Sequence, residues 1–435
     1  MPTLFHRDRP VAEVTPSPSG LTLTYEEAWR GWPDAFPVSL SMPMDQAAWP
    51  PEVVVPWLMN LLPEGEPMRA MQRALGVAQE DVLGLVSAAG GDLAGALRVG
   101  GPRGEQGGYR PVSSQEDLER IIGELPRKPF LAGDEGVTMS LAGAQDKLPV
   151  AMLDGQIAIP LDGAPSTHIL KPDNPRLPGS VQNEALCMVL AARCRLPVAS
   201  VATGRAGDRS YLLVDRYDRA GQAPTATRLH QEDVCQALGF PPGAKYERNQ
   251  TGVRGPSLAD MFALVRRHMT AVDITRLLDA VIFNIAIGNV DSHAKNYSIL
   301  LTADGAALAP LYDLMCGLPW PGITQNHAQA VGGQVRGRHI QVRHWRRMAE
   351  ACGLAPAATV RRVISLTNRI QREIGAAAEA VAAMPAGGGA FLDVLVHYIS
   401  DRTALVGRNA AQDDDRNEDD GEDSARTEAF PSSPR

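Results

Sequence analysis

The spacing of apolar side chains changes along the chain and divides it into an N-terminal αβ part, a strand-rich middle part and a helical C-terminal part. Residues 20–25 alternate apolar and polar side chains, as a strand does. The apolar run over residues 51–62 begins with a proline and stops before Gly65, which predicts a helix. We therefore expect residues 1–105 to form a separate small αβ module.

The middle of the chain is predicted to be a strand-rich lobe over residues 136–225, joined to the first module by a linker region over residues 106–135. The linker is expected because residues 100–110 are rich in glycine and polar side chains. One helix is expected in the lobe, over residues 183–196, where apolar residues recur at helical spacing. Short apolar runs separated by glycine or Asp-Gly turns predict strands at residues 137–141, 147–153, 156–161, 167–171 and 210–214.

The remaining folded part, residues 226–400, is predicted to be a helical lobe. Ser257 and Asp260 have the spacing of a capping box, and the helix after that one is expected to end at Gly288. Acidic side chains over residues 230–233 suit the start of a short helix. A strand-rich lobe followed by a helical lobe predicts an α+β, bilobed protein-kinase-like fold.

The stretch that follows Gly288 carries the strongest chemical signal. Asp291 and Asn296 are five positions apart, which is the spacing of the catalytic Asp and the metal-binding Asn in the protein-kinase catalytic loop. Strand-like runs over residues 297–301 and 306–311, separated by a turn, predict a hairpin that returns Asp313 beside Asn296. Asn296 and Asp313 would then offer hard oxygen ligands for Mg²⁺, with Asp291 as the base. Because Asn and Asp are also common in turns, the pair alone fits a plain turn as well.

Two further features suit the handling of a nucleotide. Residues 138–147 contain small side chains that let backbone N–H groups approach phosphate oxygens, although a plain hairpin turn fits them too. Lys171 ends an apolar strand and could hold phosphates with Glu184 as its acidic partner, or be a surface lysine before a proline. Residues 214–219 follow a strand where a kinase hinge would lie, and a charged loop with local ion pairs is the other interpretation.

Composition narrows the function classes. The 435 residues carry a net charge of −8, but nine acids and two arginines in residues 413–428 account for −7 of it. The folded body is therefore near neutral, which argues against a protein that coats nucleic acid, and residues 405–435 are expected to be a disordered acidic tail. The five cysteines show no metal-binding spacing, and no apolar run approaches the roughly 20 residues of a membrane span. We expect a cytoplasmic protein with no membrane partner.

Common motifs of other enzyme classes are missing from the sequence: it contains no Walker A, GxGxxG, HExxH or GxSxG pattern. A locally basic stretch over residues 336–347 is interrupted by apolar side chains. It fits a half-exposed helix face, and a contact with phosphate or DNA is the alternative.

Several separated segments, in order, resemble the HipA family of bacterial serine/threonine-kinase toxins over about residues 1–400. They are SLAGAQDK at 140–147, THILKP at 167–172, RLHQED at 228–233, GNVDSHAKNYS at 288–298 and LYD at 311–313, with LLPEG at 61–65 and GGDLAGAL at 90–97 in the N-terminal module. Departures are small: Val290 and Ser292 flank the base, and Asp146 and Asp215 stand where the family often has Glu.

The resemblance implies a role for each matching residue. Asp291 would be the catalytic base, Asn296 and Asp313 would bind Mg²⁺, and Lys171, partnered by Glu184, would contact the phosphates of ATP. Ser140 would be an autophosphorylation site whose phosphate ejects the phosphate loop, because the added charge repels ATP phosphates. The implied ATP-binding residues are Ala142, Gly143, Ala144, Gln145, Asp146, Lys147, Lys171, Asp215, Arg216, Tyr217, His293, Ala294, Lys295, Asn296, Tyr312 and Asp313.

The resemblance also implies a toxin-antitoxin system. Its kinase would phosphorylate an aminoacyl-tRNA synthetase, and a HipB-type helix-turn-helix antitoxin would bind the kinase and carry it to operator DNA. Two alternatives stay open at this point. The chain could be a non-catalytic co-repressor module that acts with the antitoxin on DNA, or a kinase for a small molecule or lipid.

Overall fold

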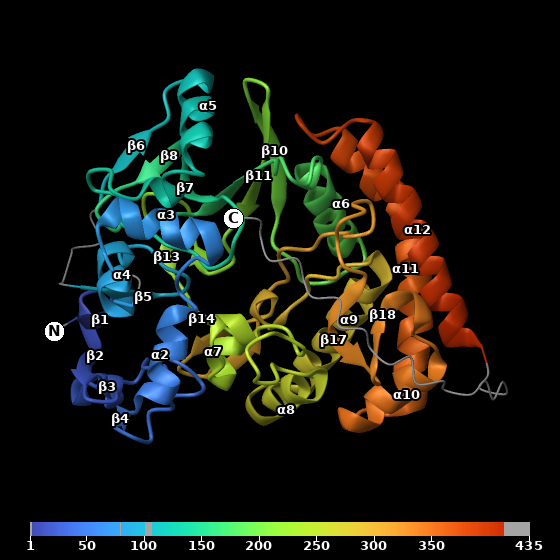
Figure 1. Cartoon of the computed structure of the whole chain (residues 1–435), viewed down its shortest axis with the longest axis horizontal. Coiled ribbons are helices and arrows are strands. Elements are labelled where there is room, and N and C mark those ends of the chain that lie inside the picture. Colours follow the sequence, from blue (N-terminus) through green and yellow to red (C-terminus); the bar gives the residue numbers. More distant parts are fainter. Residues whose placement is uncertain (1, 79, 101–106, 413–435) are drawn as a thin grey trace.

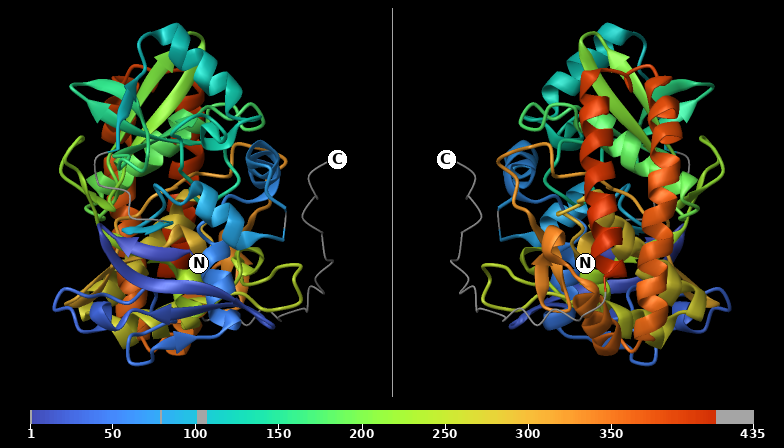
Figure 2. Two further views of the ribbon diagram at one scale, coloured as in Figure 1. Left: turned by 90° about the vertical axis from the view of Figure 1, so that its left-hand side faces the viewer. Right: turned by 90° about the vertical axis from the view of Figure 1, so that its right-hand side faces the viewer.

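The computed structural model describes residues 2–78, 80–100 and 107–412, and it has the expected α+β architecture in which sheets precede a helical region (Figure 1). The N-terminal strands and the six-stranded sheet occupy one side of the molecule. The long C-terminal helices form the opposite side, as the two rotated views show (Figure 2). The expected acidic tail lies outside the described residues from position 413 onward, but residues 405–411 are part of a helix rather than of a tail.

The N-terminal part is an antiparallel sheet with the order β4-β3-β2-β1-β5. Its strands are β1 (Thr3–His6), β2 (Arg9–Ser17), β3 (Gly20–Tyr25), β4 (Ala48–Trp49) and β5 (Leu97–Val99). Its helices are α1 (Glu27–Arg30), α2 (Pro51–Met59), α3 (Gly65–Leu75) and α4 (Val82–Ala89). The strand predicted at 20–25 and the helix predicted from residue 51 are confirmed, although that helix ends at Met59.

A six-stranded sheet with the order β10-β11-β9-β7-β8-β6 forms the next layer. Its strands are β6 (Tyr109–Pro111), β7 (Leu148–Leu153), β8 (Gln156–Pro160), β9 (His168–Pro172), β10 (Val201–Ala206) and β11 (Arg209–Asp215), and α6 (Ser180–Arg193) packs beside them. The strand predicted at 137–141 is wrong: Met139 makes only an isolated bridge to Asp92. The reason is that this stretch runs from the N-terminal part to the six-stranded sheet and does not pair along its length with a strand of either sheet.

The predicted linker region contains secondary structure. Beyond residue 106 it holds β6, which pairs with β8, then α5 (Gln115–Glu124) and the 3₁₀ turn η1 (Pro129–Leu131). Side chains of α5 such as Ile122 are buried in the same apolar cluster as Leu4 of β1 and Val150 of β7. The N-terminal part is therefore not a separate body, because it shares one hydrophobic core with the six-stranded sheet.

The helical lobe consists of α7 (Val234–Leu238), α8 (Leu258–His268), α9 (Ala271–Ile287), α10 (Val342–Ala351), α11 (Pro356–Ala382) and α12 (Ala390–Ala411). The last two lie side by side and, with α9 and α6, enclose a second apolar core (Figures 1 and 2). The predicted capping box of Ser257 and Asp260 starts α8, and Gly288 caps α9 in a left-handed conformation. No helix in the described part of the chain is long and apolar enough to cross a membrane.

A three-stranded sheet with the order β14-β15-β16 lies where the two lobes meet. Residues 230–233 were expected to open a helix, but they form β14 (His230–Asp233), and the helix begins one residue later with Asp233 as its cap. The prediction was wrong because residues 230–233 pair with the distant strand β15 (Ser298–Thr302). The local sequence pattern does not reveal this pairing. β15 and β16 (Gly305–Leu308) form the predicted hairpin.

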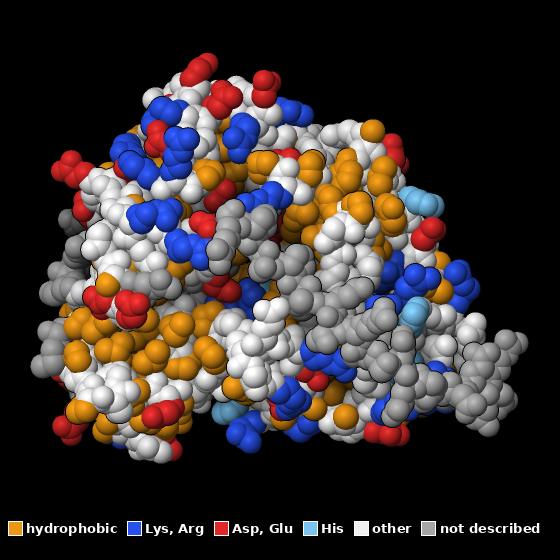
Figure 3. All heavy atoms as spheres, in the orientation of Figure 1, with side chains coloured by type: hydrophobic (Ala, Val, Ile, Leu, Met, Phe, Trp, Pro, Cys, Tyr) orange, Lys and Arg blue, Asp and Glu red, His pale blue; other side chains and the backbone are white. Residues whose placement is uncertain are grey.

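Short ribbons complete the fold: β12 (Arg219–Ala220) pairs with β13 (Thr227–Arg228), and β17 (Asn326–Val331) with β18 (Gln334–Arg336). Four 3₁₀ turns are present in the described chain, η1 and also η2 (Pro242–Ala244), η3 (Ala294–Asn296) and η4 (Gly337–His339). On the surface over α5, basic and acidic side chains are intermixed (Figure 3). Arg120 there pairs with Asp117 and Glu124, so this face is not a uniformly basic surface.

Candidate active site

A cavity of about 450 Å³ between the six-stranded sheet and the helical lobe collects most of the predicted site residues. Those that line it are Ala142, Gly143, Ala144, Gln145, Lys147, Lys171, Asp215, Arg216, Tyr217, Asp291, His293, Lys295, Asn296, Tyr312 and Asp313. Four predicted residues do not line it: Ser140, Asp146, Glu184 and Ala294. Segments up to about 170 residues apart in sequence thus converge on one space large enough for a small-molecule ligand.

Lys171 lies at the centre of an ion triad on the wall of the cavity. Its Nζ is 2.7 Å from Oε1 of Glu184 and 2.7 Å from Oδ1 of Asp313. Burial opposes the charge on Lys171, but the carboxylates of Asp313 and Glu184 outweigh it and raise the pKa of Lys171. Lys171 is therefore a cation at neutral pH. Glu184 is the partner that the sequence predicted, and it orients the lysine from behind the cavity.

The β15–β16 hairpin returns Asp313 to the cavity that Asn296 lines, as the sequence predicted. Tyr312 donates its hydroxyl to the carbonyl of Lys295 at 2.6 Å, which ties the segment after the hairpin to the loop that carries Asn296. Asp313 itself has a φ of 56°, a left-handed conformation that few residues other than glycine adopt. Such strain is often found at functional sites. Although burial opposes ionisation, Lys171 and Lys147 lower the pKa of Asp313, so it is a carboxylate.

The loop after α9 is held by its own polar side chains. The N–H of Asp291 donates to Oδ1 of Asn289 at 3.1 Å, and Nδ2 of Asn289 donates to Asn284 within α9 at 2.9 Å. Nδ2 of Asn296 donates to the carbonyl of Asp291 at 2.9 Å, so the amide oxygen of Asn296 is left to face a ligand. This bond spans the five-residue spacing and fixes Asn296 relative to Asp291.

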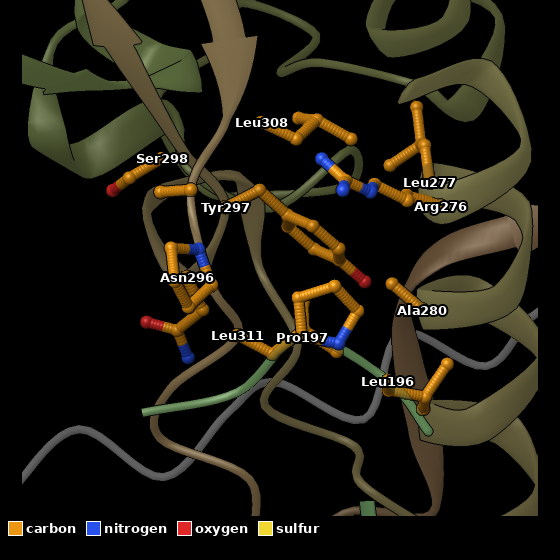
Figure 4. A pocket seen from close by; sticks show the side chains of 12 residues that line it. Leu196, Pro197, Arg276, Leu277, Ala280, Asn296, Tyr297, Ser298, Leu308 and Leu311 are labelled. Atoms are coloured by element: carbon orange, nitrogen blue, oxygen red, sulfur yellow. The ribbon is translucent and has the colours of Figure 1, made fainter. Parts of the chain in front are cut away.

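Behind this loop is a small, mostly apolar hollow of about 20 Å³ against α9 (Figure 4). The ring of Tyr297 extends toward Leu277 and Ala280 of α9, whereas the side chain of Asn296 points away from that ring. Nδ2 of Asn284 donates to the hydroxyl of Tyr297 at 3.0 Å. Tyr297 thus anchors the loop to the helix and leaves Asn296 directed toward the larger cavity.

The loop from Ala142 to Lys147, at one end of the cavity, is held by a hydrogen bond across it. Nζ of Lys147 donates to the carbonyl of Ala142 at 2.7 Å across the loop. Gly143 has a φ of 107°, a backbone conformation that favours glycine, and a Cβ there would also push against Nζ of Lys147 at 2.6 Å. Burial and the nearby Lys171 lower the pKa of Lys147 to about 8. Two cations, Lys147 and Lys171, therefore face the same end of the cavity, which suits a phosphate group.

Ser140, the predicted modification site, is fully buried. Its hydroxyl donates to the carbonyl of Leu61 at 3.1 Å, and its N–H donates to the carbonyl of Asp92 at 3.2 Å. Both partners belong to the N-terminal part. The closed phosphate loop is therefore anchored on that part through Ser140.

The stretch after β11, predicted as a possible hinge, is fixed by a buried charge network. Arg216 and Arg219 contact the carboxylate of Asp92 at 3.5 and 2.8 Å, and Arg228 contacts it at 3.0 Å. Despite complete burial, Arg219 and its neighbours lower the pKa of Asp92, which stays ionised. Sequence reasoning interpreted this stretch as either a hinge or a charged loop with local ion pairs. The structure shows both local ion pairs, from Arg216 and Arg219 to Asp218 at 2.7 and 2.9 Å, and the long-range pairs to Asp92, in a stretch that also lines the cavity.

Sequence reasoning missed several cavity residues. Glu64, just after α2, pairs with Lys245 at 2.8 Å and with Lys295 of the catalytic loop at 3.4 Å. Asn60 accepts from Lys295 at 2.7 Å. The segment LLPEG at 61–65 had been noted, but nothing in it showed that it would reach a loop more than 200 positions away. Tyr246, the other important omission, donates its hydroxyl to Oδ1 of Asp291.

The donor set fits a nucleotide with a hard metal ion. Asn296 and Asp313 offer oxygen ligands at the cavity, as Mg²⁺ prefers, and phosphate oxygens would complete its coordination. Among the described residues, no three His, Cys, Asp or Glu side chains gather into a metal site. Burial lowers the pKa of His293 to about 4, and its Nδ1 has no hydrogen-bond partner in the part of the chain that the structure describes. A neutral, unsatisfied imidazole at the cavity is a further group that a ligand could engage.

The predicted basic stretch over residues 336–347 lies away from this cavity. Arg343 and Arg346 are half-buried members of α10, and Trp345 between them is fully buried. The half-exposed helix face that the sequence favoured is therefore present from Val342 onward, whereas residues 336–339 form the end of β18 and the turn η4.

A two-lobed fold, an ion triad on the sheet side and an Asp-Asn loop on the helical side define a phosphotransferase of the protein-kinase type. Two family models match the chain: the HipA N-terminal domain over residues 3–100 and the HipA-like C-terminal domain over residues 139–378. The chain belongs to the HipA family of serine/threonine-protein kinase toxins.

Relatives and a solved structure agree with this assignment. A protein named as a kinase, Y4mE of Sinorhizobium fredii, is 39% identical over 79% of this chain and 83% of its own. The serine/threonine-protein kinase toxin HipA of Shewanella oneidensis is 29% identical over 88% of this chain and 89% of its own. The structure of Shewanella oneidensis HipA with HipB and operator DNA superposes with a TM-score of 0.82, at 26% identity, over 95% of this chain and all of that one.

Proposed function

We propose that this protein transfers the γ-phosphoryl group of ATP to a serine or threonine hydroxyl, with Mg²⁺ as its metal ion. One observation carries the proposal: Lys171, Asp313 and the loop residues Asp291 and Asn296, from three separate segments, line the same 450 Å³ cavity. Lys171 and Lys147 would bind the phosphates, and the small residues from Ala142 to Gln145 would cover them. Mg²⁺, held by Asn296 and Asp313, would neutralise charge on the phosphates.

Asp291 would act as the base. It is exposed at the cavity. Asn289 and Asn296 fix the loop through hydrogen bonds to the backbone of Asp291, so its carboxylate is not needed to hold the loop. It would accept the proton of the acceptor hydroxyl as the new phosphorus–oxygen bond forms and ADP leaves. The backbone of residues 215–217 would face the adenine, as the position of these residues after β11 suggests.

Autophosphorylation of Ser140 is proposed as the switch of this kinase. In the closed state the hydroxyl of Ser140 is fully buried against Leu61, so a phosphate there could not be accommodated. The phosphate loop would have to leave the cavity, and the two lysines would lose their fixed relation to the nucleotide.

The substrate and partners are proposed from the family. An aminoacyl-tRNA synthetase would be the protein substrate, and a HipB-type helix-turn-helix antitoxin would bind the kinase and bring it to operator DNA. The complex of Shewanella oneidensis HipA with HipB and operator DNA supports the partner part of this proposal. Intact Lys171, Asp291, Asn296 and Asp313 make a purely non-catalytic co-repressor the weaker candidate.

Intact-protein and peptide mass spectrometry tests the catalytic proposal. Wild type, Asp291→Asn and Ser140→Ala are each incubated with Mg-ATP. One phosphate on the Ser140 peptide of the wild type, absent from Asp291→Asn, is the expected result. Phosphate on Asp291→Asn at the wild-type rate would remove Asp291 as the base. Phosphate elsewhere in the wild type would keep the kinase and remove Ser140 from the scheme.

A further inference from the structure

The carboxylate of Asp291 is already engaged by a side chain of the protein. The hydroxyl of Tyr246 donates to Oδ1 of Asp291. This contact is not needed to build the loop, because Asn289 and Asn296 hold the backbone of Asp291 on both its N–H and its carbonyl. The hydroxyl of Tyr246 therefore contacts the carboxylate of Asp291, whereas Asn289 and Asn296 contact its backbone.

Tyr246 is held at this place by contacts on both sides of it in sequence. The N–H of Ala294 donates to the carbonyl of Lys245 at 3.1 Å, and Nζ of Lys245 donates to Glu64 at 2.8 Å. On the other side the N–H of Glu247 donates to the carbonyl of Ala328 at 3.0 Å. The ring of Tyr246 lies edge-on to His293 with 5.2 Å between centroids. The segment thus presents the phenol to the cavity from a fixed backbone.

A phenol at this position has the chemistry of the acceptor that the enzyme must bind. In phosphoryl transfer the acceptor hydroxyl donates a hydrogen bond to the base before its oxygen attacks phosphorus. Burial and the neighbouring Asp291 carboxylate raise the pKa of Tyr246, so the phenol keeps its proton at neutral pH and remains a donor. Tyr246 therefore satisfies Asp291 in the same way that an acceptor serine would.

Resting on the proposed role of Asp291, we propose that Tyr246 occupies the subsite of the acceptor hydroxyl and competes with the acceptor for the base. A serine or threonine on a docked protein substrate displaces the phenol by rotation of the Tyr246 side chain. Water, which has no docking contacts to offset that loss, displaces it poorly. Tyr246 is thus a residue that favours a docked protein acceptor over water, and the acceptor approaches from the side of residues 245–247.

The experiment compares wild type with Tyr246→Phe, which removes the hydroxyl and keeps the ring against His293. Tyr398→Phe is the matched control, because Tyr398 is an exposed tyrosine of α12, remote in sequence and outside the lining of the cavity. The first readout is hydrolysis of Mg-ATP with water as the acceptor. The second does not depend on activity: labelling of Asp291 by a water-soluble carbodiimide and glycine ethyl ester, quantified by peptide mass spectrometry against Asp304.

The expected result for Tyr246→Phe is a roughly tenfold rise in ATP hydrolysis, the size expected for loss of a hydrogen bond to a charged group, together with faster labelling of Asp291. Tyr398→Phe should change neither. Unchanged hydrolysis and labelling in Tyr246→Phe would overturn the proposal. Faster labelling with slower hydrolysis would also overturn it, because Tyr246 would then position the base. Phosphate found on Tyr246 of the wild type would also overturn the proposal, because the phenol would then be an acceptor of the phosphoryl group and not a competitor of the acceptor.

The variant Asp291→Asn, alone and combined with Tyr246→Phe, separates this inference from the proposed function. Loss of hydrolysis in both is expected. If Asp291→Asn hydrolyses ATP as fast as wild type, the proposed function of Asp291 fails. The labelling comparison between wild type and Tyr246→Phe still reports whether the phenol covers that carboxylate.

Discussion

Lys171 of β9 and Asp313, which are 142 positions apart in sequence, are joined by an ion pair of 2.7 Å at the wall of the cavity. Glu184 contacts the same ammonium group at 2.7 Å, so the lysine is shared by two carboxylates. The pair connects the sheet lobe with the segment that follows the β15–β16 hairpin. A nucleotide that enters between them would bring phosphate oxygens to Lys171 and a metal ion to Asp313. The Lys171–Asp313 ion pair would then be replaced by one between Lys171 and phosphate and one between Asp313 and the metal ion.

Substitution of Lys171 tests this arrangement. Lys171→Met is expected to lower kcat/KM for ATP by about 100-fold or more, because a buried cation at the phosphates is lost and Glu184 and Asp313 then repel them. ATP affinity by calorimetry and transfer by radiolabel measure the effect. Lys128→Met, at an exposed lysine paired with Asp134, is the matched control and should behave as wild type. An unaltered ATP affinity in Lys171→Met would contradict the assignment.

The buried carboxylate of Asp92 is predicted to be the main tie between the N-terminal part and the hinge. Asp92→Asn leaves Arg216, Arg219 and Arg228 without their common counter-charge and should lower the free energy of unfolding by about 3–5 kcal/mol. Urea unfolding gives the measurement. Asp134→Asn, which breaks only partly exposed ion pairs, should cost about 1 kcal/mol or less. Equal losses of unfolding free energy in the two variants would show that the buried network around Asp92 stabilises the fold no more than an exposed ion pair does.

The buried position of Ser140 makes a clear prediction for charge at that site. Ser140→Asp places a carboxylate against the carbonyl of Leu61, so the loop should leave the cavity and ATP should bind at least about tenfold more weakly. Ser140→Ala loses one hydrogen bond and should bind ATP almost as wild type. Calorimetry measures the affinity, and limited proteolysis of residues 140–147 reports the loop. If Ser140→Asp binds ATP like Ser140→Ala, the anchoring role of Ser140 is wrong.

Glu232 is predicted to make stability depend on pH. Burial raises its pKa from 4.5 to about 8, while Ser39 and the N–H of Leu40 are its hydrogen-bond partners. The folded state therefore keeps a proton that the unfolded chain releases near pH 4.5. This contribution to stability is complete below about pH 4.5 and is lost as the pH rises toward about 8.

The comparison of wild type with Glu232→Gln isolates that group, because every other titration is shared. Relative to wild type, the variant should gain roughly 3 kcal/mol in free energy of unfolding between about pH 5 and about pH 8. Urea unfolding at both pH values provides the numbers. A difference between the two proteins that is independent of pH would mean that Glu232 does not carry the proton.

The sequence by itself determined the local structure of the loop that carries Asp291 and Asn296, because the signals are local. The five-residue spacing of Asp291 and Asn296, the cap at Gly288 and the hairpin over residues 297–311 all depend on neighbouring residues, and the structure has them in place. Lys171 and Glu184 were paired correctly for the same reason, since a strand followed by a helix limits where the two side chains can meet.

Only the tertiary structure decided what reaches that loop from a distance. The local pattern predicts a helix start at residues 230–233, but these residues form β14, whose partner strand is about 70 positions away. The strand expected at 137–141 is instead a crossing segment held by the hydrogen bond between Ser140 and Asp92. Glu64 and Tyr246 lie in segments whose local pattern gives no sign of chemistry. Burial of charge and long-range hydrogen bonds place them, and these depend on how the shared core brings the N-terminal part against the lobes rather than on any periodicity along the chain.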